Sequence, residues 1–298
     1  MNPREKGFLL LTSHLGIPDR KVLSQAQLRQ LSRRTSGLIA SDKDRDLELQ
    51  DLIRLGYGAD MAVRILSLLN DEEILHHYLH RGRQSGCTPL TRVSAAYPQI
   101  LRGRLGPDSP GCLWVKGDRS VLQTPGIALV GSRELSEKNR AFAEAVGIRA
   151  AERGLALVSG NARGADRTAQ EACLCHGGSV ISIVADRLDR QEERERVLYV
   201  SEDGFDLPFS AQRALSRNRV IHCWGELTFV AQARLGMGGT WDGTVQNLRS
   251  GWSTVVCFRD GSDAMAALDE QGAYLADIPE LEDMTSFIQI QENLFHRS

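Results

Sequence analysis

Ala128-Leu-Val-Gly-Ser-Arg133 is a short apolar run that ends abruptly in glycine and small polar residues. Leu157-Val-Ser-Gly-Asn-Ala-Arg-Gly-Ala-Asp166 repeats the pattern, and a helical pattern follows each of the two. A continuous apolar run is typical of a parallel strand that is buried on both faces. The first N–H groups of the helix after such a turn are unpaired and attract an anion. Two such turns on neighbouring strands therefore predict a phosphate-binding site.

Strand and helix patterns continue to alternate beyond these two stretches. We expect strands at 127–130, 155–159, 180–184, 197–200, 227–231 and 254–258, and helices at 137–153, 165–176, 211–223, 241–250 and 263–271. Such alternation predicts a doubly wound α/β fold with a mostly parallel sheet that helices cover on both faces. Ligands of these sheets bind beyond the carboxyl ends of the strands, where both glycine turns lie.

The remaining residues predict three parts of the chain. Residues 1–85 have helical spacing, for example in Met61-Ala-Val-Arg-Ile-Leu-Ser-Leu-Leu69. They predict a small helical (SAM-like) domain that either binds DNA or a partner or only packs. Residues 86–125 are rich in proline and glycine and read as a connection, with a short strand at 112–115. This connection is the first part of the α/β domain, which extends over residues 86–275. Residues 276–298 form a C-terminal tail.

Composition excludes several classes of protein. The net charge is −2, so any attraction to phosphates has to come from a local basic patch. The six cysteines contain no CxxC pair, which favours buried free thiols in a reducing cytoplasm over a disulfide framework or a zinc site. We expect no signal peptide and no membrane span, since no apolar run reaches the ~18 residues that a span needs. The expected location is the cytoplasm.

The first two glycine turns supply most of the candidate binding residues. Arg133, directly after Gly131 and Ser132, can hold a phosphate with two parallel N–H donors; the alternative is a surface salt bridge. The second turn contributes the hydroxyl of Ser159, the flexible backbone of Gly160 and Gly164, and the further cation Arg163. Asp166 is expected to cap the turn or pair with an arginine, because a carboxylate beside a phosphate is repulsive.

Two further segments add candidates. Arg217, Asn218 and Arg219 form a dense cluster of donors on an expected helix, with a solvated helix face as the alternative. A third glycine-rich turn, 236–244, contains Gly239 and the hydroxyls of Thr240 and Thr244. Trp241 in this turn either stacks on a base or packs against the core.

No arrangement for catalysis is visible. The dinucleotide fingerprint G-x-G-x-x-G and the P-loop pattern are absent, which disfavours an ordinary NAD or ATP enzyme. No Ser-His-Asp order occurs, and His76 with His80 lacks the glutamate of H-E-x-x-H. We therefore expect no catalytic residue, no metal and no cofactor.

The motifs, taken in order, resemble those of the DNA-processing protein A (DprA/Smf) family. They are Tyr97-Pro98, the segment 110–117, Val130-Gly-Ser-Arg133, Ser159-Gly-x-Ala-x-Gly-x-Asp166, Ser201-Glu202 and Arg217-Asn-Arg-Val-Ile221. The glycine-rich turn at 240–244 falls where the family has its S-G-x-x-x-T element. Each motif alone is weak, but the order and spacing are specific, and the resemblance spans residues 50–275.

The resemblance implies an extended Rossmann-like domain that binds single-stranded DNA in a positive pocket, without being an enzyme. It implies a role in DNA uptake during transformation and in loading a RecA-type recombinase, and a homodimer. Carried over to this sequence, the pocket draws on the residues of the two turns, 131–133 and 159, 160 and 164, and on 217–219.

Two other functions remain open. The wider superfamily includes sensors of nucleotide-derived ligands, which gives an alternative role in antiviral defence. It also includes hydrolases that release a base from a nucleoside monophosphate by a P-G-G-x-G-T-x-x-E motif. Gly238-Gly-Thr-Trp-Asp-Gly-Thr-Val-Gln246 resembles that motif only loosely and places Gln246 near where the catalytic glutamate would fall.

Overall fold

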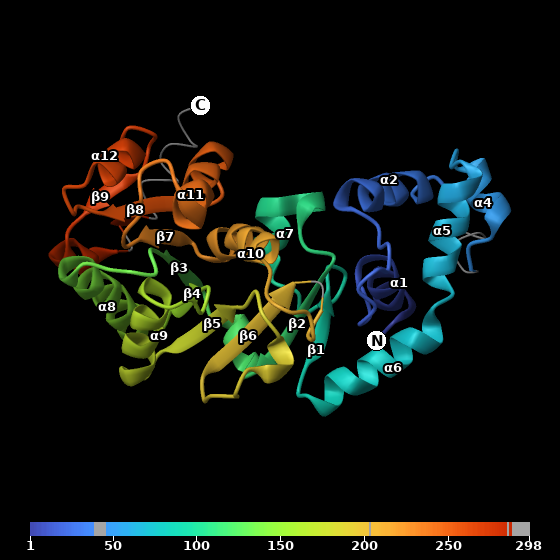
Figure 1. Cartoon of the computed structure of the whole chain (residues 1–298), viewed down its shortest axis with the longest axis horizontal. Helices are drawn as coiled ribbons and strands as arrows, with labels where there is room; N and C mark the ends of the chain where they lie inside the picture. The colour runs from blue at the N-terminus through green and yellow to red at the C-terminus, as the bar shows by residue number, and fades with distance from the viewer. Residues whose placement is uncertain (39–45, 203, 285, 288–298) are drawn as a thin grey trace.

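The apolar runs form one sheet in the computed structural model of the chain, which describes residues 1–38, 46–202, 204–284 and 286–287. Within these residues the sheet has nine strands in the order β1-β2-β6-β5-β4-β3-β7-β8-β9 (Figure 1). They are β1 (Thr88–Thr91), β2 (Cys112–Gly117), β3 (Gly126–Val130), β4 (Ala156–Ser159), β5 (Ser179–Ile183), β6 (Val197–Glu202), β7 (Leu227–Val230), β8 (Thr254–Phe258) and β9 (Tyr274–Ala276). Neighbours from β6 to β9 pair parallel, which confirms the expected doubly wound, mostly parallel sheet.

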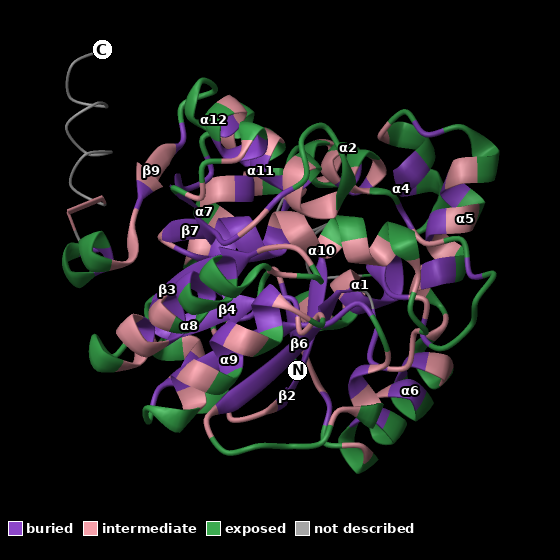
Figure 2. Ribbon diagram, turned by 60° about the vertical axis from the view of Figure 1, so that its left-hand side comes forward, coloured by how far each residue is buried: buried purple, intermediate pink, exposed green. Residues whose placement is uncertain are grey.

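Helices cover both faces of this sheet, so the strands are buried on both sides (Figure 2). One face carries α8 (Glu137–Glu152) and α9 (Ala165–Cys175), and the other carries α7 (Gln99–Leu105), α10 (Ala211–Trp224), α11 (Gly238–Ser250) and α12 (Asp263–Asp269). In β3, Ile127 and Leu129 pack with Phe142 of α8, whereas Ala128 and Val130 belong to the core under α10. This two-sided burial is the physical reason for the unbroken apolar runs.

The N-terminal residues fold as the expected helices, beyond β1 in Figure 1. They are α1 (Pro3–Thr12), α2 (Gln25–Thr35), α4 (Leu49–Arg54), α5 (Ala59–Leu69) and α6 (Glu72–Gln84). Leu28, Leu52 and Ile65 form part of a separate apolar core among them. Tyr78 of α6 joins the main core instead, where its ring stacks on Phe205 at 4.5 Å between centroids. The boundaries at residues 85 and 275 stay a proposal, and most of the tail 276–298 lies outside the described residues.

The segment 86–125 is more ordered than the expected connection. It contributes β1, α7, β2 and two short 3₁₀ helices, Gly106–Asp108 and Arg119–Gln123. β1 and β2 pair antiparallel with each other, and β2 pairs antiparallel with β6. The sequence did not indicate β1 because proline is uncommon in strands and only four residues take part.

β1 forms one edge of the sheet, and its outward-facing donors are already accounted for. The N–H of Arg92 donates to Gly111 O, so residues 88, 90 and 92 face β2 and residues 89 and 91 face outward. Pro89 has no N–H, and the N–H of Thr91 donates to Ser94 Oγ at 3.0 Å. This edge therefore offers no free strand donor at either position.

The strand order also identifies where a ligand is expected. From β3 the chain moves outward through β4, β5 and β6, and then returns to the other side of β3 with β7. Such a reversal leaves a crevice outside the carboxyl ends of the two central strands, because their following loops run in opposite directions. The crevice lies between the loops after β3 and β7.

Candidate functional site

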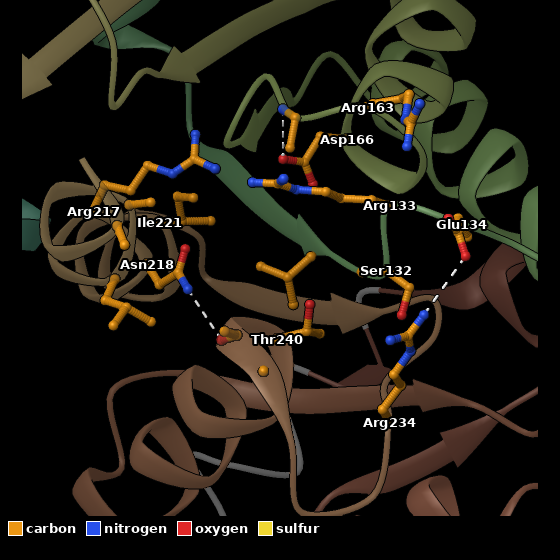
Figure 3. A pocket seen from close by; sticks show the side chains of 18 of the residues that line it. Ser132, Arg133, Glu134, Arg163, Asp166, Arg217, Asn218, Ile221, Arg234 and Thr240 are labelled. Atoms are coloured by element: carbon orange, nitrogen blue, oxygen red, sulfur yellow. Dashed lines mark hydrogen bonds and ion pairs between the residues drawn. The ribbon is translucent and has the colours of Figure 1, made fainter. Parts of the chain in front are cut away.

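A cleft of about 520 Å³ opens at this switch point (Figure 3). Its walls come from the loops after β3, β4 and β7, from the residues before and within α10, and from the start of α11. The lining residues are Val130, Gly131, Ser132, Arg133, Glu134, Ala162, Arg163, Asp166, Phe209, Ala211, Ala214, Leu215, Arg217, Asn218, Ile221, Arg234, Met237, Gly238, Gly239 and Thr240.

The loop after β3 presents Arg133 to the cleft. The N–H of Ser132 donates to Gln232 O at 2.9 Å, which fixes this loop to the one after β7. At Gly131 a Cβ would lie 2.5 Å from the Cβ of Ala165, so only glycine allows this close approach of α9. The Arg133 side chain is exposed, and within the described residues it has no hydrogen bond or ion pair. Figure 3 shows it extending across the cleft beside Asp166.

The loop after β4 is closed by Asp166 rather than left open for an anion. The Asp166 carboxylate accepts from the N–H of Gly160 at 3.1 Å and from the N–H of Ala162 at 3.0 Å. Burial raises the pKa of Asp166, and Arg217 and the two N–H donors act against that rise. The expectation that the backbone N–H groups of both glycine turns are open to a phosphate is therefore wrong for Gly160 and Ala162, because Asp166 accepts from both.

Arg217 reaches this closed loop from α10. Its Nη1 donates to Ile183 O at 2.8 Å, and its guanidinium rests on Gly160, where a Cβ would come within 2.6 Å of Arg217 Cζ. Burial lowers the pKa of Arg217 and the nearby Asp166 raises it, and an arginine stays a cation at neutral pH. A cation is thus held at the floor of the cleft.

Asn218 and the start of α11 form the opposite wall. Asn218 Nδ2 donates to Gly239 O at 3.0 Å, which ties α10 to α11 (Figure 3). α11 begins at Gly238 and not at Trp241 as expected, so Gly239 and Thr240 lie in its first turn. No side chain caps this helix, and the positive end of its dipole adds to the potential of the cleft.

Five of the predicted binding residues do not line the cleft. Ser159 is fully buried and its hydroxyl accepts from Gln170 Nε2 at 2.6 Å, and Thr244 is fully buried and donates to Thr240 O at 2.7 Å. Arg219, two residues after Arg217, lies on another side of α10 and approaches Glu202 at 3.9 Å. Gly160 and Gly164 shape the loop after β4 without lining the cleft.

Trp241, for which stacking on a base and packing were both open, packs against the core under α11.

Gly164 has a positive φ of 88° and touches the first loop. A Cβ there would lie 2.4 Å from Arg133 O and 2.5 Å from Ser132 O. The glycine therefore allows the two loops to meet, although it offers no surface to a ligand. The other nine predicted residues are brought together around the cleft: Gly131, Ser132, Arg133, Arg163, Asp166, Arg217, Asn218, Gly239 and Thr240.

Sequence reasoning missed the residues at the rim. Phe209, Leu215 and Met237 line the cleft with half or more of their surface exposed. Arg234, in the loop after β7, forms an ion pair of 3.6 Å with Glu134, in the loop after β3 (Figure 3). Leu235 and Met237, the apolar residues on either side of Gly236 in an otherwise glycine-rich turn, were the available signal for an unusual loop.

Glu134 offers a direct test of whether the cleft attracts anions. Glu134→Gln removes a negative charge beside Arg133 and frees Arg234 from its ion pair, so we expect affinity for a single-stranded oligonucleotide to rise about two- to fivefold at low salt. Fluorescence anisotropy at 50 and 200 mM salt measures the effect. Glu144→Gln, an exposed change of the same charge on α8, is the control and should leave affinity unchanged. Weaker binding by Glu134→Gln would argue against an anion site.

Among the residues that the structure describes, no group of three or more His, Cys, Asp or Glu side chains is placed to hold a metal ion. Cys87, Cys112, Cys173, Cys223 and Cys257 are buried free thiols, and Cys175 is an exposed one.

The chain is similar in sequence to known proteins. A family model described as DNA recombination-mediator protein A matches residues 88–247, which is more than half of the chain. DNA processing protein DprA of Streptococcus pneumoniae is 30% identical over 181 residues, covering 56% of this chain and 64% of the relative. Protein Smf of Escherichia coli is 31% identical over 156 residues, covering 47% of this chain and 40% of the relative. Both alignments span less than two thirds of the relatives' own length.

Solved structures show the same fold. The structure of DNA processing protein A from S. pneumoniae matches with a TM-score of 0.66 at 23% identity, covering 88% of this chain and 98% of that chain. A structure from Helicobacter pylori, described for the single-stranded DNA binding mode of its DNA processing protein A, matches with a TM-score of 0.55 at 23% identity. It covers 70% of this chain and 96% of that chain.

Proposed function

Because this chain belongs to the DNA recombination-mediator protein A family, we propose that it binds single-stranded DNA in the cleft and acts in DNA processing. The observation that carries the proposal is the convergence of Arg133, Arg163 and Arg217 on one cleft at the switch point of the sheet. Arginine suits phosphate because its planar group donates two parallel hydrogen bonds. The net charge of −2 then matters little, since the attraction is local.

The geometry favours a flexible strand over a duplex. Arg133, Arg163 and Arg217 line one concave cleft of about 520 Å³, whereas a duplex presents its phosphates on a wide, stiff surface. The proposed ligand contacts come from eight of the lining residues predicted from the sequence, whereas Asp166 closes the second turn: Gly131, Ser132, Arg133, Arg163, Arg217, Asn218, Gly239 and Thr240. The five predicted residues that do not line the cleft would support these contacts by holding the cleft walls in place: Ser159, Gly160, Gly164, Arg219 and Thr244.

The proposal also covers the ligand class, the protein partners and the cellular location of the chain. The H. pylori DNA processing protein A is described as binding single-stranded DNA, and we extend the same ligand class to this chain. We propose a homodimer that does not catalyse a reaction and that hands DNA to a RecA-type recombinase in the cytoplasm. The buried free thiols fit a reducing compartment. Within the described residues no helix has the length and apolar character to cross a membrane.

A nucleotide-sensor role remains the alternative, and one binding experiment separates it from the proposal. A labelled single-stranded oligonucleotide should bind more tightly than the duplex of the same sequence, and the affinity should fall as salt rises because phosphate contacts release counterions. Free nucleoside mono- and triphosphates should compete poorly. Equal affinity for duplex would contradict the proposal, and strong competition by one free nucleotide would favour the sensor.

A further inference from the structure

Phe209 is exposed in a way that no other described aromatic residue is. Its relative exposure is 57%, while Phe142, Phe205 and Phe229 are at most 1% exposed. Among the Phe, Tyr and Trp side chains of residues 1–38, 46–202, 204–284 and 286–287, it is the only one in the exposed class. Leaving so much aromatic surface in water is unfavourable, so its position on the wall of the cleft suggests a ligand.

The backbone that carries Phe209 is held in place. Arg213 Nη1 donates to Leu207 O at 3.0 Å and to Pro208 O at 2.9 Å, and its Nη2 donates to Ser201 Oγ at 2.8 Å. Ser210 caps the N-terminus of α10, and its side chain accepts from the N–H of Arg213 at 3.1 Å. One arginine therefore fixes both sides of Phe209, and the ring projects from a braced segment.

A second brace comes from the N-terminal helices. Tyr78 Oη of α6 donates to Asp206 Oδ1 at 2.6 Å, and Arg81 Nη2 lies 2.9 Å from Asp206 Oδ2. Asp206 directly precedes Leu207, the first residue that Arg213 holds. Helix α6 therefore helps to hold the part of the chain that presents Phe209.

The cleft has two chemically different sides. Arg133 and Arg163 extend from the loops after β3 and β4, and neither side chain has a hydrogen bond or ion pair within the described residues (Figure 3). Phe209, Leu215 and Met237 contribute apolar surface from the segment before α10, from α10 and from the start of α11. A single strand has the same two sides, since phosphates lie along one side and unpaired bases project from the other.

We propose that Phe209 is the platform on which an unpaired base of the bound strand stacks, with Met237 and Leu215 completing the apolar wall. This inference rests on the proposed function and adds the contact that selects unpaired bases. Every base has a flat aromatic face, so the platform accepts any base. A duplex keeps its bases stacked within the helix and cannot offer one to Phe209.

The test compares two oligonucleotides of equal length and charge, oligo-dT and an abasic phosphodiester strand. Phe209→Ala should weaken binding of oligo-dT about five- to a hundredfold, which corresponds to about 1–3 kcal/mol for one stacked base. It should change binding of the abasic strand less than twofold, with the same salt dependence. Phe209→Trp should retain most of the affinity for oligo-dT. Leu235→Ala, a neighbouring apolar residue that is 50% exposed and does not line the cleft, is the control.

Each outcome has a distinct meaning. Equal losses for both strands, or no loss for either, would overturn the platform while leaving the proposed function intact. Failure of the unaltered protein to bind oligo-dT at all would overturn the proposed function and the platform together. A change of oligomeric state in Phe209→Ala, measured by light scattering, with unchanged DNA affinity would assign Phe209 to a protein contact and overturn the proposal.

Discussion

Asp166→Ala is expected to lower the free energy of unfolding by about 2–4 kcal/mol, the largest stability effect of any change in the cleft. The carboxylate satisfies the N–H groups of Gly160 and Ala162, and each buried donor left without an acceptor costs about 1–3 kcal/mol. The cost of burying the charge, which raises the pKa of Asp166, offsets part of this loss. Urea unfolding followed by circular dichroism measures the difference.

Two further variants sharpen this stability prediction. Asp166→Asn keeps one oxygen acceptor and should cost less than Asp166→Ala. Asp242→Ala removes the same charge from an exposed position on α11 and should cost less than about 0.5 kcal/mol. If Asp166→Ala were as stable as the unaltered protein, the closed loop after β4 would not depend on this side chain.

Arg133→Ala is expected to weaken binding of a single-stranded oligonucleotide by about ten- to a hundredfold with no change in melting temperature. Hydrogen bonds to charged groups contribute about 1.5–3 kcal/mol, and each 1.4 kcal/mol is about tenfold in affinity. Stability should hold because the side chain is exposed and makes no hydrogen bond or ion pair within the described residues. Arg133→Lys should recover only part of the affinity, since a point charge cannot donate the two parallel bonds.

The control for Arg133→Ala is Arg249→Ala, which removes an exposed positive charge from the last turn of α11, away from the cleft. It should change affinity less than twofold. A structural salt bridge between Arg133 and Asp166 was the alternative raised by the sequence. That alternative requires Arg133→Ala and Asp166→Ala to lower the melting temperature alike. We expect them to separate, with stability lost in Asp166→Ala and binding lost in Arg133→Ala.

The fold could be predicted because local patterns determine it. The strands at 126–130 and 156–159 are buried on both faces, so their apolar runs are continuous and their ends are marked by glycine. The family resemblance is confirmed for the same reason, since its motifs lie at the ends of those strands. β1 was not predicted because proline is uncommon in strands. The structure tolerates Pro89 because this residue faces outward, away from the hydrogen bonds between β1 and β2.

The site could be predicted only in part because side-chain direction depends on tertiary packing. Ser159 and Thr244 have the composition of ligand donors, but each points inward and forms a hydrogen bond within the protein. Asp166 lies six residues after Gly160 in the sequence, and only the tight turn at Gly164 brings its carboxylate back to that N–H. Phe209 carries no motif at all, and its importance depends on exposure, which a sequence does not state.

The edge formed by β1 has a consequence for self-association. A strand that joins a sheet needs N–H donors as well as carbonyl acceptors along its new neighbour. On the outward side of β1, Pro89 has no N–H group because its ring includes the nitrogen. The N–H of Thr91 already donates to Ser94 Oγ, so neither residue offers a donor to a new strand. Addition of a strand from a second molecule is therefore disfavoured at this edge, while the cleft beyond the carboxyl ends of β3 and β7 stays open to solvent.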